Sequence, residues 1–96
     1  MIRYTCMRAI LPTVEAALAA HGYTVESPLA KDLNGDRMIV MTRSSTVVLL
    51  SECAQSEVAD IEIYGAAPAA ATALLEQLPI RLFRQAAHHE IRSRQN

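Results

Sequence analysis

The chain has 96 residues, of which 51% are hydrophobic, 20% are charged and 4% are aromatic, and its formal net charge is −1. This length predicts one domain over residues 1–96, and the composition is too apolar and too balanced in charge for a disordered chain. Because no window approaches about 18 uninterrupted apolar residues, we expect no membrane-spanning helix.

The first expected element is a helix over about residues 8–21, where large apolar side chains recur three or four positions apart. Gly22 is a suitable residue to follow its last turn. Pro12 is harmless only in a first turn, so the extension of this helix back to residue 8 stays open. Residues 2–9 alternate between apolar and polar types, which leaves a strand there as the alternative.

The same stretch does not read as a secretory signal. Pro12, Thr13 and Glu15 interrupt it, so no apolar segment of about 7–15 residues remains. The two cysteines, Cys6 and Cys53, suit a reducing compartment in which both are buried as small hydrophobic residues. We therefore expect a cytoplasmic protein.

A hairpin over residues 37–52 is the clearest element, and a short strand from Tyr23 and a turn-rich connection precede it. Its two apolar runs flank a polar segment, for which we expect a loop of about four residues. Neither run alternates, so both faces of the hairpin are apolar. Such a hairpin is either sandwiched within the fold or covered by another subunit. The candidate dimer face comprises Met38, Val40, Val47 and Leu49.

Residues 58–64 alternate and predict a strand with one wet, acidic face. Helices are expected over 67–78, with Pro68 in the first turn, and over 80–94, after Pro79. The order of elements predicts an α+β fold. We expect a small, mainly antiparallel sheet of three to five strands, with the three helices mostly on one of its faces.

Motifs for catalysis or metal binding are absent. His88 and His89 are adjacent, and on a helix their side chains point about 100° apart, so they cannot chelate one ion. Residues 32–36 resemble the start of a calcium loop, but Gly35 and Arg43 stand at the wrong positions. We therefore expect no enzyme activity, no cofactor and no metal.

The near-zero net charge is a cancellation between two regions. Residues 80–96 contain four arginines and one glutamate, which gives +3, whereas residues 1–79 contain five basic and nine acidic residues, which gives −4. Two candidate partner-binding faces follow from this distribution. The basic face comprises Arg81, Arg84, His88 and Arg92, and the acidic face comprises Glu57, Asp60 and Glu62.

Together these features favour a small non-catalytic protein-binding module that regulates, adapts or inhibits a larger protein complex. The size and composition resemble those of small phage or mobile-element inhibitors of host systems, anti-CRISPR proteins among them, although no motif carries this resemblance. One alternative is a nucleic-acid-binding accessory protein that uses the basic C-terminal helix. Another is a small ligand-binding domain or enzyme. The sequence leaves open the partner, the oligomeric state and what the basic helix binds.

Overall fold

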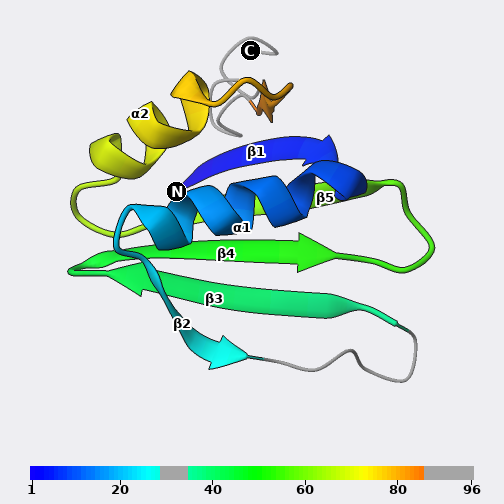
Figure 1. Ribbon diagram of the computed structural model, residues 1–96, viewed down its shortest axis with the longest axis horizontal. Coiled ribbons are helices and arrows are strands. Elements are labelled where there is room, and N and C mark those ends of the chain that lie inside the picture. The colour runs from blue at the N-terminus through cyan, green and yellow to red at the C-terminus, as the bar shows by residue number, and fades with distance from the viewer. Residues whose placement is uncertain (29–34, 86–96) are drawn as a thin grey trace, which may run out of the picture.

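The computed structural model describes residues 1–28 and 35–85, which form an α+β domain with one six-stranded antiparallel sheet (Figure 1). The strands are β1 (Ile2–Met7), β2 (Thr24–Pro28), β3 (Arg37–Arg43), β4 (Thr46–Glu52), β5 (Val58–Tyr64) and β6 (Phe83–Arg84). The α-helices in these residues are α1 (Leu11–Ala20) and α2 (Ala69–Gln77), and a 3₁₀ turn, η1 (Arg8–Ile10), leads into α1.

The strand order in the sheet is β2-β3-β4-β5-β1-β6. The first strand of the chain thus lies between β5 and β6, where it pairs with β5 from Ile2↔Ile63 to Met7↔Val58. Strands β3, β4 and β5 follow one another as a meander, and each pairs with the next over most of its length. The sheet is therefore continuous from the β2 edge to β6.

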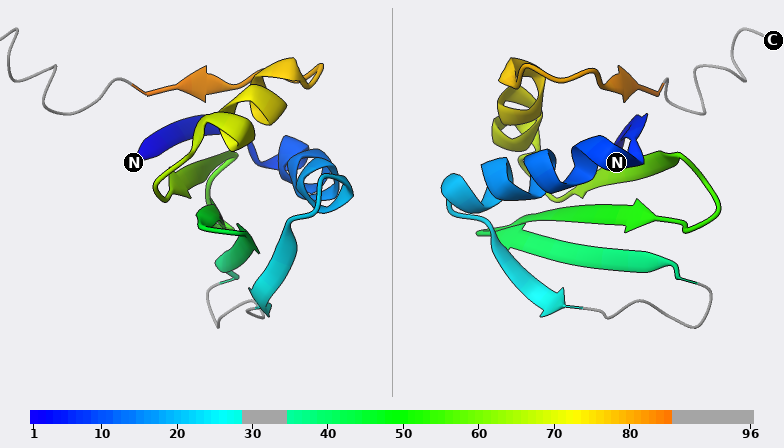
Figure 2. Two further views of the ribbon diagram at one scale, coloured as in Figure 1. Left: turned by 90° about the vertical axis from the view of Figure 1, so that its left-hand side faces the viewer. Right: turned by 45° about the vertical axis from the view of Figure 1, so that its right-hand side comes forward.

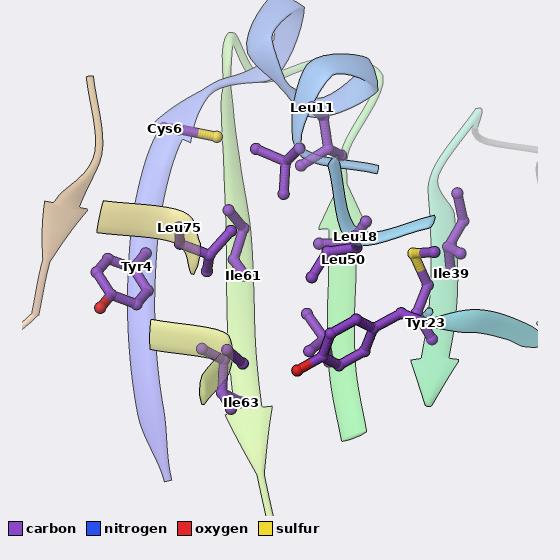
Figure 3. Close-up of a cluster of buried hydrophobic side chains, with 14 of the residues drawn as sticks. Tyr4, Cys6, Leu11, Leu18, Tyr23, Ile39, Leu50, Ile61, Ile63 and Leu75 are labelled. Carbon is purple, nitrogen blue, oxygen red and sulfur yellow. The ribbon is translucent and has the colours of Figure 1, made fainter. Parts of the chain in front are cut away.

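Both helices pack on the same face of this sheet, which we call the core face (Figure 2). Their inward side chains join the buried strand residues in a single hydrophobic cluster (Figure 3). Along β3, β4 and β5 burial alternates residue by residue, so that only one side of each strand is fully buried. The helices contribute Leu11, Val14, Leu18, Ala71 and Leu75 to the cluster.

The α+β class, the central hairpin and the first two predicted helices are confirmed, and residues 2–7 form a strand rather than a helix. The sheet has six strands instead of three to five. The hairpin loop is also shorter than expected, since Arg43 pairs with Thr46 and leaves a two-residue turn. Ser44 has a φ of 53°, and a positive φ at the first central residue is typical of a type II′ turn.

The predicted helix over 80–94 is wrong where the structure describes it. Residues 80–82 are irregular, and β6 pairs with β1 through Tyr4↔Arg84 and Thr5↔Phe83. The physical reason is that the apolar side chains recur at every second residue. Leu78, Ile80 and Leu82 all pack against the core, whereas on a helix residues two positions apart point to different sides. The remainder of the predicted helix, residues 86–94, lies outside the described residues.

Gly65 ends β5 at a point where the backbone leaves no room for a side chain. Its φ is +126°, and an added Cβ would lie 2.4 Å from the carbonyl oxygen of Ser45 in the hairpin turn. Because both the conformation and the space exclude alanine, we expect Gly65→Ala to lower the free energy of unfolding by about 2 kcal/mol or more. Chemical denaturation measures this loss.

Gly22 provides the matched control for this prediction. Its φ is +90°, but an added Cβ would meet only the Arg43 side chain at 3.7 Å. Gly22→Ala should therefore cost only the conformational term of about 1 kcal/mol. Equal losses for the two variants would contradict the predicted steric conflict at Gly65.

Candidate functional site

The face of the sheet opposite the helices carries an apolar group at its centre. We call it the open face, because among the described residues no helix packs on it. The four side chains of the predicted dimer face lie together here, and Val40 and Leu49 are direct cross-strand partners. They are Met38, Val40, Val47 and Leu49, all of them exposed or half-buried. The sandwiched interpretation of the hairpin is therefore wrong for the described residues, and coverage by a second chain stays a prediction.

Other exposed apolar side chains gather on the same face. Seven large hydrophobic residues of the described chain are exposed, and the strand registers place five of them on the open face. Tyr64 is the cross-strand partner of Val47 and extends the central group. The five residues are Met7, Met38, Val58, Tyr64 and Phe83. Scattered exposed hydrophobic residues need no explanation, but a contiguous apolar patch is typical of an interaction surface. Met38 and Tyr64 adjoin the central group and form such a patch with it, whereas Met7, Val58 and Phe83 lie apart from it.

A small charged cluster interrupts this apolar surface where β5 meets β1. The Arg3 Nη2 atom lies 3.2 Å from a Glu62 oxygen and 3.7 Å from an Asp60 oxygen. The Tyr64 hydroxyl donates to the Glu62 carboxylate at 2.8 Å. This hydrogen bond raises the pKa of Tyr64, because loss of its proton would place two negative charges side by side.

The predicted acidic face is therefore only partly assembled. Asp60 and Glu62 share the open face, but they lie beside Arg3 and next to the apolar group rather than on a purely acidic surface. Glu57 stands in the loop before β5, where its backbone oxygen accepts from the Arg8 backbone N–H at 2.7 Å. Arg3 is the residue that the sequence analysis missed, because only the β1–β5 register brings it beside the two acids.

The predicted basic face is not a helix stripe in the described residues. Arg81 is exposed in an irregular segment, whereas Arg84 lies in β6 and forms an ion pair with Glu76 of α2 at 3.7 Å. His88 and Arg92 lie outside the described residues. The prediction aligned these side chains on one side of a helix, but the backbone at Arg81 and Arg84 is not helical.

A cleft of about 230 Å³ lies between α2, β1 and the segment leading into β6. The Tyr4 hydroxyl donates to a Glu76 carboxylate oxygen at 2.5 Å, and Arg84 pairs with the same oxygen from β6. Burial of Tyr4 and, to a smaller extent, its hydrogen bond to Glu76 raise the pKa of Tyr4 to about 12. Its proton is thus held throughout the physiological range, so the cluster is suited to joining three elements rather than to proton transfer. The apolar walls of the cleft are Leu75, Ile80 and Leu82.

The remaining chemically active side chains do not form a site in the described residues. Cys6 is buried, which raises its pKa, but Cys53 is exposed, contrary to the expectation that both would be buried. The His21 ring nitrogen Nδ1 lies 3.0 Å from the Ala17 carbonyl oxygen at the end of α1, as expected for a histidine at a helix terminus. Within residues 1–28 and 35–85, no group of three or more potential metal ligands comes together.

The helices of the described chain are all too short or too polar to cross a membrane. Searches against protein-family models, curated proteins and solved structures found no match to this chain. Function must therefore be argued from the geometry of the open face and of the cleft.

The Tyr4 hydroxyl makes the stability of the fold sensitive to alkaline pH. An unfolded tyrosine loses its proton near pH 10.0, whereas Tyr4 keeps it to about pH 12. Ionisation therefore favours the unfolded chain as the pH rises between these values, and the free energy of unfolding should fall by about 1–2 kcal/mol. Tyr4→Phe should lack this decline, which denaturation at several alkaline pH values measures.

Tyr23 and Tyr64 are common to both chains, so the difference between the two curves isolates Tyr4. Curves that run parallel from pH 8 to pH 12 would contradict the raised pKa.

Proposed function

We propose that this chain is a non-catalytic protein-binding module that uses the open face of its sheet as the interface. In this role it acts as a regulator, adaptor or inhibitor of a larger protein. The observation that carries the proposal is a contiguous apolar patch on the one sheet face that the described helices leave uncovered. It comprises Met38, Val40, Val47, Leu49 and Tyr64, which adjoin one another along and across β3, β4 and β5.

The arrangement of this face supports protein binding over the alternatives. Interfaces typically combine a packed apolar centre with polar and charged groups, and aromatic and methionine side chains are enriched in them. Here Leu49 and Tyr64 lie beside Glu62 of the charged cluster, and Val40 and Met38 continue the apolar surface on β3. A sheet face of this kind offers contact area for another protein, whereas small-molecule sites are typically concave.

The cleft gives less support to an enzyme or ligand-binding role. It contains neither cysteine nor histidine, and its carboxylate already accepts from Tyr4 and Arg84. The described arginines also give little support to nucleic-acid binding, which stays a prediction. Arg84 forms an ion pair with Glu76, and Arg81 does not lie on a helix.

The proposal is tested by affinity capture with three tagged baits: the native chain, Val40→Thr/Leu49→Thr and Val25→Thr. Threonine keeps the β-branched shape of valine and replaces one of its methyl groups with a hydroxyl. At position 49 it replaces the larger, γ-branched leucine with a smaller polar residue that still suits a strand. We expect the double variant to retain about tenfold less of a protein that the native bait enriches. Quantitative mass spectrometry of the captured proteins measures this loss.

Val25 is the matched control, because it is 44% exposed on β2 but pairs with Met41, whose side chain faces the core. Val25→Thr should capture the partner as well as the native chain does. Thermal melting of all three proteins separates loss of binding from loss of folding. Undiminished capture by a folded double variant would show that the open face is not the interface.

A further inference from the structure

The charges on the open face indicate what kind of protein segment would bind it. Among the residues that the structure describes, four formally charged side chains lie on or reach over this face: Arg3 is basic, whereas Glu26, Asp60 and Glu62 are acidic. Glu26 belongs here because it accepts a hydrogen bond at 3.1 Å from Thr42, whose neighbours on β3 place its side chain on the open face. For these described residues, one positive and three negative charges give a formal net charge of −2.

The three carboxylates differ in how far the protein already satisfies them. Glu62 accepts from the Tyr64 hydroxyl at 2.8 Å and pairs with Arg3 at 3.2 Å, and its side chain is only 15% exposed. Asp60 is 40% exposed, and its two contacts are long: 3.5 Å to the Thr5 hydroxyl and 3.7 Å to Arg3. Asp60 therefore retains most of its capacity to accept hydrogen bonds.

Arg3 does not fill the remaining hydrogen-bonding capacity of Asp60. The same atom of Arg3, Nη2, contacts each acid, and the Arg3 Nε is buried without a hydrogen-bond partner among the described residues. A strong arginine–carboxylate pair is bidentate and uses two nitrogens in parallel. If a partner covered this face with apolar groups only, the Asp60 carboxylate would lose water and gain no compensating contact, which is costly.

We propose that the open face binds an apolar protein segment that carries a lysine or arginine positioned to pair with Asp60. The apolar part would cover the Val40–Leu49 pair, and the cation would meet Asp60 on β5, which lies opposite Ser51 and diagonally across from Leu49. This inference rests on the proposed function, because it assumes that the open face is the interface. A second copy of the chain fits less well, since it would bring another net charge of −2 against the first and its own Arg3 is already engaged.

Two synthetic helical peptides serve as probes for this proposal. Both have leucines along one face, and the flanking residues are lysines in one peptide and glutamines in the other. Amide chemical shifts of the labelled full chain locate the binding, and fluorescence anisotropy measures the affinity. We expect the lysine peptide to bind more tightly and to shift resonances of β3, β4 and β5.

Asp60→Asn is the informative variant, and Glu57→Gln is its control. Each removes one negative charge, but Glu57 lies in the loop before β5. Asp60→Asn should weaken the lysine peptide by up to about fivefold, the scale of one partly exposed ion pair, and leave the glutamine peptide unaffected. Glu57→Gln should change neither affinity.

Three outcomes would overturn the inference. The first is equal binding of both peptides, and the second is an equal effect of Asp60→Asn and Glu57→Gln. The third is a native chain that dimerises in light scattering through a contact that Val40→Thr/Leu49→Thr abolishes, while neither peptide binds. In the first two cases the proposed interface itself would stand, because it depends on the capture result with the Val40→Thr/Leu49→Thr bait and not on the charge of the partner.

Discussion

One-sided burial of the sheet is the constraint on which the rest of this structure depends. A chain of 96 residues has enough large apolar side chains for one core, and α1 and α2 both pack on the face where that core forms. Along β3, β4 and β5 the side chains nevertheless alternate, so about half of them point away from the core. The apolar residues on that second side are the feature that calls for a functional explanation.

The short strand β6 covers the edge that β1 would otherwise expose. β1 would present an unpaired edge if the chain turned away after α2, but β6 pairs with it through Tyr4↔Arg84 and Thr5↔Phe83. Glu76 then fastens α2 to both strands by accepting from Tyr4 and pairing with Arg84. The basic charge that the sequence assigned to an interaction surface is thus used, at Arg84, to hold the fold together.

Local patterns in the sequence were sufficient for most of the elements and for part of the site. The unbroken apolar runs of residues 37–52 predict both the hairpin and the shared face of Val40 and Leu49, because side-chain direction in a strand follows from period two alone. The segment after Pro79 was predicted to be a helix because its apolar residues Ile80, Phe83, Ala87 and Ile91 also fit a helical spacing. The alternation of Leu78, Ile80 and Leu82 was the signal that would have identified it as extended.

The charged cluster could not be predicted, because it depends on pairing between distant parts of the chain. Nothing local in the sequence sets Arg3 opposite Glu62; the β1–β5 register does. That register turns an acidic strand face into a mixed surface on which Asp60 has spare hydrogen-bonding capacity. The most direct measurement of the central claim is thiol labelling of a Val47→Cys variant, free and bound to its captured partner, with the exposed Cys53 as internal reference. If the open face is the interface, the thiol at position 47 becomes protected on binding while Cys53 stays reactive; equal labelling of position 47 in both states would contradict the account.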